Sequence, residues 1–241
     1  SYYDSCIELL ESAGYIVKKS IYNSAAFGVP QERYRSIVMG MKREFCLPDE
    51  IYDVPEFRTV RDAIADLPAL AAGESSADPL HRAIRHKSST IETIRKVPHD
   101  GGYLPAGAGP ACRSRTKGFA DVYGRLAWDK PSITITHYAR NPASGRFVHP
   151  VQDRGLTARE AARLQSFPDG FQFCGKSDDV YRQIGEAVPP LFACGLASYL
   201  LANFLKPELD SSEFEQSRPS IDEPVSDSYS SVIAGIKMRR F

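Results

Sequence analysis

YIVKKSIYNSAAFGVPQERYRSIVMGMK, residues 15–42, is the stretch of the sequence that limits the fold most. Both of its ends are rich in β-branched and aromatic residues, which predicts strands at residues 15–22 and 33–42. A loop is expected between them, at residues 23–30. A two-stranded hairpin is marginally stable at best by itself, so these strands must pack against something that this chain or another one supplies.

Helices are predicted on both sides of this hairpin. Residues 2–13 place apolar side chains at helical spacing, and Gly14 supplies a stop. Residues 189–205 begin with Pro and are apolar nearly all round, as expected for a helix packed on several sides. Helix, strand, loop and strand is the order that we expect at the end of an α/β domain.

The middle of the sequence has a different texture, because Pro and Gly are frequent between residues 47 and 155. Helices are expected at residues 59–67 and 88–97, and short strands such as residues 132–138 should follow them. The expected caps and terminator of the two helices are Thr59, Ser88 or Ser89, and Pro98. This region therefore predicts a small separate domain.

The composition is that of a globular protein. The chain has 241 residues, of which 42% are hydrophobic and 25% charged. No apolar run approaches 18 residues and no leader pattern is present, so a soluble, cytoplasmic protein without a membrane partner is expected. The five cysteines are odd in number, scattered and without a CxxC pair, which disfavours disulfides and a metal site.

The zero net charge hides an uneven distribution. Residues 207–241 carry seven acids and four bases, which leaves +3 on residues 1–206. This small excess neither excludes nor proves nucleic-acid binding, which needs a local basic strip. The tail also contains eight Ser and two Pro between residues 211 and 231, so it is expected to be disordered.

Two arginines stand out within the first motif, GVPQERYRS at residues 28–36. Arg33 and Arg35 are two residues apart on a predicted strand, so both side chains are expected on one face. A half-exposed strand with alternating charge is the plain alternative. Gln31 precedes them and can donate and accept hydrogen bonds at once.

Two further motifs follow in order, LTAREAARLQSFPDGF at residues 156–171 and YRQIGEAVPP at residues 181–190. In the former, Thr157 and Glu160 form a capping box, and Pro168 is expected to close the helix. The ordered trio resembles the DNA (cytosine-5) methyltransferases. The resemblance implies methyl transfer from S-adenosylmethionine to carbon 5 of a flipped cytosine in duplex DNA, within a restriction-modification system.

The resemblance also implies a division of the chain. In that family the cofactor loop, the Pro-Cys nucleophile and the Glu-Asn-Val acid precede the first of these motifs, and here no cysteine follows a proline. The chain is therefore expected to be the C-terminal half, cut from a longer enzyme or a subunit of a split one, with the N-terminal half as partner.

The fold class that follows is α/β, with the end of a Rossmann-like S-adenosylmethionine-dependent domain and a small mixed, strand-rich target-recognition domain. The expected parts are the end of the catalytic domain at 1–46, the recognition domain at 47–168, a C-terminal helix returning to the catalytic domain at 169–206, and the tail at 207–241.

Site residues are carried over from the resemblance position by position. Gln31, Arg33 and Arg35 are expected at the flipped cytosine, with Arg35 at its exocyclic oxygen. Thr134, in KPSITIT, matches a hydroxyl that contacts a DNA phosphate. A strip of Arg113, Arg115 and Lys117 is expected to contact phosphates, and a solvated basic loop is an equal alternative.

The cofactor is expected at Glu186 and Ala187. The family usually has Asn where this chain has Glu186, and an ionised carboxylate cannot donate as an amide does. It can instead pair with the ammonium group of S-adenosylmethionine. Two alternatives stay open. Glu186 and the missing nucleophile suggest a catalytically inactive DNA-binding homologue, and the resemblance also allows a tRNA cytosine methyltransferase, since one branch of the family methylates tRNA.

Overall fold

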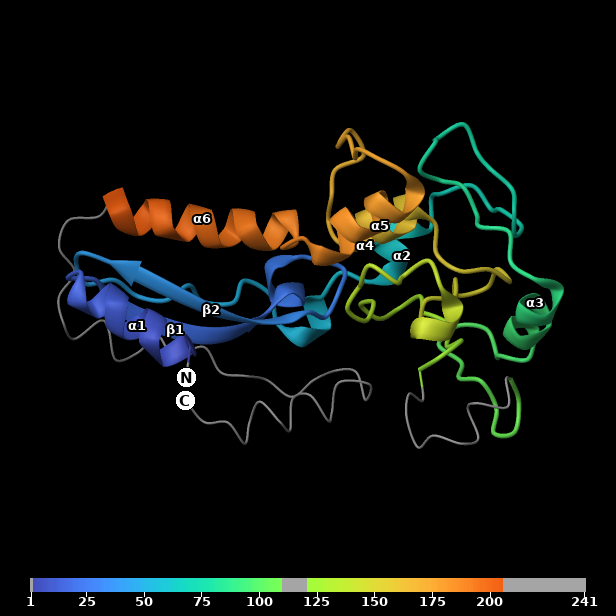
Figure 1. Cartoon of the computed structure of the whole chain (residues 1–241), viewed down its shortest axis with the longest axis horizontal. Coiled ribbons are helices and arrows are strands. Elements are labelled where there is room, and N and C mark those ends of the chain that lie inside the picture. Colours follow the sequence, from blue (N-terminus) through green and yellow to red (C-terminus); the bar gives the residue numbers. More distant parts are fainter. Residues whose placement is uncertain (1, 110–120, 206–241) are drawn as a thin grey trace.

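A computed structural model of the chain describes residues 2–109 and 121–205 and shows two lobes joined at one end (Figure 1). The first lobe is elongated and consists of the hairpin, the N-terminal helix and the last helix. The second lobe holds the remaining helices and long irregular connections. The predicted basic strip at Arg113, Arg115 and Lys117 and the predicted disordered tail lie outside the described residues.

The predicted hairpin is confirmed. Strand β1, Ile16–Asn23, pairs antiparallel with β2, Tyr34–Met41. The side-chain oxygen of Asn23 accepts from the backbone N–H groups of Ala25 and Arg33, at 3.2 Å each, and so ties the two ends of the loop together. Within the loop, residues Ser24–Phe27 form a 3-10 helix, η1, which ends at Gly28 with φ 81°. A side chain there would be strained and would press on the ring of Tyr52.

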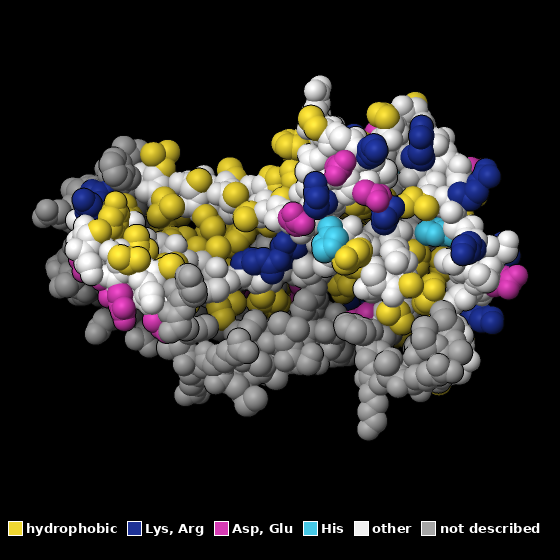
Figure 2. Space-filling view, viewed as in Figure 1, with side chains coloured by type: hydrophobic (Ala, Val, Ile, Leu, Met, Phe, Trp, Pro, Cys, Tyr) yellow, Lys and Arg dark blue, Asp and Glu magenta, His cyan; other side chains and the backbone are white. Residues whose placement is uncertain are grey.

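The two flanking helices lie on opposite sides of the hairpin (Figure 1). Helix α1, Tyr2–Ser12, confirms the first predicted helix, and α6, Pro190–Leu205, confirms the last. Phe192 of α6 packs against Phe27, with ring centroids 4.9 Å apart. The prediction that α6 is packed on several sides is wrong for the described chain, since Leu201 is 60% exposed. Hydrophobic side chains are visible along this helix in Figure 2.

The second lobe is built on short helices around one core. Its core includes Ile64, Leu126, Ile135 and Leu164, which are at most 1% exposed. The helical segments of this lobe are α2 (Val60–Ile64), α3 (Ser88–Arg95), η4 (Pro142–Ser144), α4 (Ala158–Leu164) and α5 (Ser177–Glu186). A further 3-10 helix, η2 (Val54–Glu56), comes before them, and Phe57 at its end packs against the core of the hairpin lobe.

The prediction of a strand-rich second domain is wrong for the described residues. The only ladder among them is β1–β2, and elsewhere only isolated bridges occur, such as Gln31↔Ser132. The expected strand at 132–138 is not formed: Ser132 makes only an isolated bridge, through backbone bonds with Pro30 and Glu32, and residues 137–138 lie in a turn. The N–H of Ile135 donates to Gln31 and its carbonyl accepts from Arg33, so a neighbouring strand has fewer groups left to pair with.

Helix ends follow the predicted caps in two of three places. Thr59 and Thr157 each accept at their helix N-terminus and belong to capping boxes. The N-cap of α3 is Lys87 rather than Ser88 or Ser89, which lie within the helix.

The C-terminal boundary also differs from the expected one. Val180, Tyr181 and Ile184 of α5 belong to the core of the second lobe, so α5 lies with that lobe and only α6 returns to the hairpin.

One segment, Ser177–Ala202, has the length and mean hydropathy (1.4) of a membrane-crossing helix. This is a weak indication, because an apolar helix of a globular protein meets the same criterion. The structure also divides the segment into α5 and α6 at residues 187–189, and Asp178 and Asp179 lie in the first turn of α5.

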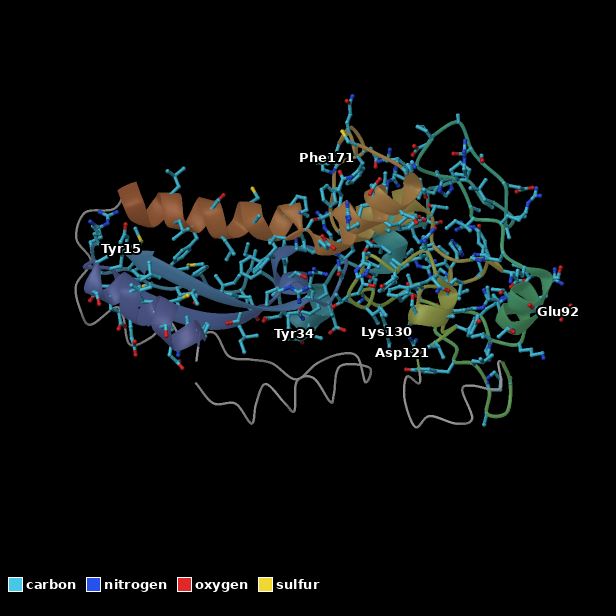
Figure 3. The ribbon with its side chains drawn as sticks, viewed as in Figure 1. Tyr15, Tyr34, Glu92, Asp121, Lys130 and Phe171 are labelled. Carbon is cyan, nitrogen blue, oxygen red and sulfur yellow. The ribbon has the colours of Figure 1, made fainter. Side chains whose placement is uncertain are left out.

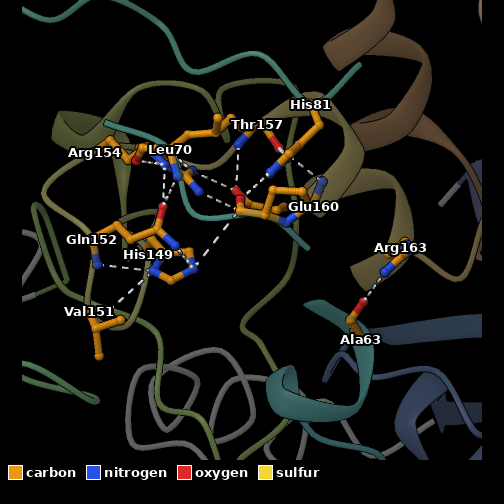
Figure 4. Close-up of polar contacts among 12 residues, drawn as sticks. Ala63, Leu70, His81, His149, Val151, Gln152, Arg154, Thr157, Glu160 and Arg163 are labelled. Atoms are coloured by element: carbon orange, nitrogen blue, oxygen red, sulfur yellow. Dashed lines mark hydrogen bonds and ion pairs between the residues drawn. The ribbon is translucent and has the colours of Figure 1, made fainter. Parts of the chain in front are cut away.

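A buried polar network stabilises the second lobe (Figure 4). Arg154, with no exposed side-chain surface, donates to both carboxylate oxygens of Glu160 at 2.8 and 2.7 Å. Burial opposes ionisation of Glu160, but the hydrogen bonds from Arg154 outweigh it and keep the pKa below its ordinary value. Removing one partner of such a pair costs about 3–5 kcal/mol, because the other charge is left buried.

His149 borders this network and is held neutral. Burial lowers the pKa of His149 to about 4. Its Nδ1 also accepts from the backbone N–H groups of Val151 and Gln152, at 3.2 and 3.0 Å, and protonation of that nitrogen would remove both acceptor contacts. The neutral ring is therefore part of the folded state of this lobe.

We expect acid to destabilise the second lobe in a defined window. The pKa of His149 is about 4 in the folded state and about 6.5 in the unfolded chain. The stabilisation is fully present above pH ~6.5 and is lost as the pH falls towards ~4, by roughly 3 kcal/mol. Thermal unfolding of the wild type and of His149→Gln across this range should show a shallower pH slope for the variant. Equal slopes would contradict the assignment.

Candidate functional site

Gln31 is at the centre of the junction between the two lobes. Its side chain is fully buried. Its amide nitrogen donates to the carbonyl of Leu164 at 3.2 Å and to Oε1 of Gln165 at 2.9 Å. Its amide oxygen accepts from the N–H of Ile135 at 2.7 Å. Both amide atoms are thus bonded within the protein, which favours a positioning role over contact with a substrate.

Gln165, just after α4, completes the glutamine pair of Gln31 and Gln165. It is fully buried, and its amide nitrogen donates to the carbonyl of Ile184 in α5 at 2.7 Å. Sequence reasoning missed this residue, because within its block only Thr157, Glu160 and Pro168 were interpreted, and only for the ends of the helix. The available signal was a glutamine between Leu164 and Phe167, two buried apolar side chains.

Arg33 is a second link between the hairpin loop, the segment at Ile135 and the end of α5. Its guanidinium donates to the carbonyl of Ile135 at 2.9 Å and to the carbonyl of Gly185 at 3.0 Å, and the residue is only 4% exposed. A guanidinium has five donors in a rigid fork, so one side chain can hold two carbonyl groups that lie far apart in the sequence.

Arg33 and Arg35 do not share one face, which corrects the sequence prediction. Strand β2 begins at Tyr34, so the alternation that placed both arginines together does not extend to Arg33. Arg35 lies in β2 and is exposed, and its guanidinium donates to the carbonyl of Tyr34 at 2.7 Å. Figure 3 shows Tyr34 where the hairpin meets the second lobe, and Tyr15 at the hairpin's far end.

Gly185 lies in an unusually close contact. A Cβ atom at this position would be 2.1 Å from the backbone nitrogen of His137 and 2.3 Å from the carbonyl carbon of Thr136. These are backbone atoms, so they cannot rotate away as a side chain can. The glycine is therefore required for the end of α5 to pack against residues 136–137.

Thr134, predicted to contact a DNA phosphate, lies beside the first motif, and its hydroxyl already has an internal partner. The hydroxyl donates to the carbonyl of Glu32 at 3.0 Å. Its oxygen can still accept, whereas donation to a DNA phosphate would require the hydroxyl to rotate.

The two residues predicted for the cofactor are at the end of α5. Glu186 is the last residue of that helix and is exposed, and Ala187 is its half-buried C-cap. An exposed carboxylate beside a small side chain suits the ammonium group of S-adenosylmethionine, so these residues fit the amino-acid end of that cofactor. Among the described residues, no group of three or more His, Cys, Asp or Glu side chains is placed to hold a metal ion.

A cavity of about 620 Å³ opens at the lobe junction, lined among others by Pro30, Phe167 and Leu191. Neither Arg33 nor Arg35, the two arginines predicted to contact the flipped cytosine, lines this cavity. The described residues thus bring Gln31, Arg33, Thr134 and the Gly185–Ala187 turn together, and leave Arg35 on the surface of the hairpin.

A sequence profile of the family described as "C-5 cytosine-specific DNA methylase" matches residues 1–201. The chain belongs to this family. The predicted family is thereby confirmed, and the three motifs that carried the prediction all lie within the match. C-5 cytosine DNA methylases use S-adenosylmethionine as methyl donor.

Two curated relatives are bacterial type II methyltransferases by name. The chain is 38% identical to the type II methyltransferase M1.HphI of Haemophilus parahaemolyticus, over 80% of this chain and 50% of that protein. It is 35% identical to the type II methylase M.HgiDII of Herpetosiphon aurantiacus, over 78% of this chain and 56% of that protein. The chain thus spans about half the length of the curated relatives it matches.

Solved structures support the fold alone. The S. pombe Dnmt2 methyltransferase superposes with a TM-score of 0.54 at 16% identity, over 84% of this chain and 62% of that one. The Entamoeba histolytica methyltransferase EhMeth superposes with a TM-score of 0.51 at 15% identity, over 85% and 59%. The fold of the chain is therefore consistent with part of an α/β methyltransferase fold.

We expect Gly185→Ala to be strongly destabilising. The added methyl group would overlap backbone atoms of residues 136–137, at a cost of at least ~2 kcal/mol. Gly170→Ala is the matched control, since nothing lies within 4 Å of a Cβ atom there. Chemical denaturation should show a large loss for the former variant only. Equal stability of the two variants would contradict the close contact.

Proposed function

We propose that the chain is the DNA-binding and pocket-completing part of a DNA (cytosine-5) methyltransferase. Joined to the half that carries the nucleophile, it takes part in methyl transfer from S-adenosylmethionine to carbon 5 of a cytosine extruded from duplex DNA. The observation that carries the proposal is the convergence of three family motifs, through Gln31, Arg33 and Gln165, on backbone groups of residues 135, 184 and 185.

In this proposal the two arginines have different tasks. Arg35 is exposed at the start of β2 and serves as the cation that reaches the extruded ring and its exocyclic oxygen. A preorganised donor at developing charge contributes on the order of 3 kcal/mol in a dry pocket. Arg33 and Gln31 are bonded within the protein and hold the end of the loop that leads into β2, where Arg35 lies.

Contacts to the DNA backbone complete the interface. The hydroxyl of Thr134, rotated away from the carbonyl of Glu32, donates to a phosphate beside the extruded base, and Arg113, Arg115 and Lys117 neutralise neighbouring phosphates. Extruding a base costs a few kcal/mol, which such contacts must offset.

The cofactor is held in part by the end of α5. The exposed carboxylate of Glu186 accepts from the ammonium group of S-adenosylmethionine, and Ala187 leaves room beside it. The bound cofactor supplies the methyl group. An inactive DNA-binding homologue is the second candidate, because Glu186 stands where the family usually has Asn.

The remaining half of the enzyme is required as a partner, in the same polypeptide or as a separate subunit. None of the five cysteines follows a proline, so the family's nucleophile must come from elsewhere. In the described residues β2 pairs only with β1, and Leu191 and Leu201 of α6 are 38% and 60% exposed. A sheet continuing beyond β2 and covering α6 would bury these surfaces.

The names of the relatives support a role in a restriction-modification system. Type II methyltransferases are the modification enzymes of restriction-modification systems, and we place this chain in the same role, in the cytoplasm.

A chimera tests the proposed activity. The half of the Haemophilus relative that this chain does not match is joined to it, and transfer of tritiated methyl groups to plasmid DNA and to tRNA is measured. Transfer to DNA is expected, and Arg35→Ala should lower it about 100-fold.

Arg95→Ala, on α3, is the matched control and should retain activity. A chimera that binds DNA without methylating it would support the inactive homologue, and transfer to tRNA alone would support the tRNA enzyme. An equal loss in both arginine variants would rule out the role given to Arg35.

Glu186 provides a separate prediction. If its carboxylate pairs with the cofactor's ammonium group, Glu186→Gln in the chimera should weaken S-adenosylmethionine binding about tenfold, since charge-assisted hydrogen bonds contribute roughly 1.5–3 kcal/mol. Calorimetric titration measures the affinity. Tighter binding by Glu186→Asn would instead show that this residue impairs the cofactor site.

A further inference from the structure

Gln165 is hydrogen-bonded to both Gln31 and helix α5, and among the described residues no other side chain joins these two directly. Its Oε1 accepts from Gln31 at 2.9 Å and its Nε2 donates to the carbonyl of Ile184 at 2.7 Å. Ile184 directly precedes Gly185, whose carbonyl accepts from Arg33. One amide group thus links the loop of the first motif to the turn of the third.

We propose that Gln165 is a positioning residue for DNA binding, which sets Arg33 and the start of β2, where Arg35 lies, relative to the end of α5, which carries Glu186. This inference rests on the proposed function and deepens it. Gln165 contacts no substrate; it acts through Gln31, which in turn fixes the N–H of Ile135 beside Thr134.

The chemistry of the position demands an amide. Both members of the glutamine pair are fully buried, so each polar atom must find a partner inside the protein. A methionine has similar volume but makes neither bond, and it leaves Gln31 with one acceptor fewer. A glutamate keeps the acceptor towards Gln31, and it can replace the donor towards Ile184 only when it is protonated.

A purely structural role makes different predictions from a positioning role. Gln152 offers the matched comparison, because it too is held in a buried network: its Oε1 accepts from the N–H of Leu70 and from Arg154. That network lies within the second lobe, away from the hairpin loop (Figure 4). Gln152→Met should therefore reduce stability without disturbing the loop.

The experiment uses the full 241-residue chain. Binding to a plasmid-derived duplex of mixed sequence is measured at fixed salt, together with thermal stability, for the wild type, Gln165→Met and Gln152→Met. Gln165→Met should bind DNA about tenfold more weakly, as expected for the loss of one to two buried hydrogen bonds, and Gln152→Met should bind as the wild type does. Equal affinities in the two variants would overturn the proposal.

Gln165→Glu supplies a readout that a structural role would not move. A buried carboxyl group has a raised pKa, so lowering the pH from about 8 to about 6 should protonate it and restore the donor to Ile184. DNA affinity of this variant, relative to the wild type at each pH, should recover as the pH falls, and that of Gln165→Met should not. Absence of recovery would count against the proposal.

Failure of the proposed function gives a distinguishable result. If the wild-type chain binds no DNA, hydrogen exchange still tests the positioning, since the N–H of Ile135 donates to Gln31. Exchange at Ile135 should then accelerate at least tenfold in Gln165→Met relative to Gln152→Met. Unchanged exchange would show that Gln165 does not position the loop.

Discussion

The two carbonyl groups held by Arg33 are the contact on which the rest of the structure depends. One belongs to Ile135 in the second lobe and the other to Gly185 at the end of α5, and both lie against the hairpin loop. The glutamine pair repeats the connection through neighbouring backbone groups. Because these groups are buried, releasing any one of them leaves a polar atom without water, at about 1–3 kcal/mol each.

This redundancy explains why the second lobe can hold its shape with little regular structure. Extended segments there direct their backbone groups to arginine and glutamine side chains instead of to a ladder. Deeper in the lobe, Arg154 donates to Glu160, and the carboxylate of Glu160 also accepts from the backbone N–H of Thr157, which caps α4. The second lobe therefore depends on ionised and amide side chains to a degree that a sheet would not.

The elements governed by local chemistry could be predicted from the sequence. Alternation placed β1 and β2 within one residue of their ends, and the Thr157–Glu160 box located the start of α4. What escaped prediction depends on distant partners. Arg33 was taken for a strand residue because nothing local shows that Ile135 and Gly185 supply its acceptors, and Gln165 gave no sign of meeting Gln31.

The arrangement of the hairpin lobe has a consequence for handling the molecule. Within residues 2–109 and 121–205 the two strands pair only with each other, and α6 beside them presents Leu201 to solvent; a short sheet next to an exposed apolar helix is a template onto which further copies can add. Preparations of this chain will therefore tend to self-associate as concentration rises, through the hairpin and the exposed side of α6.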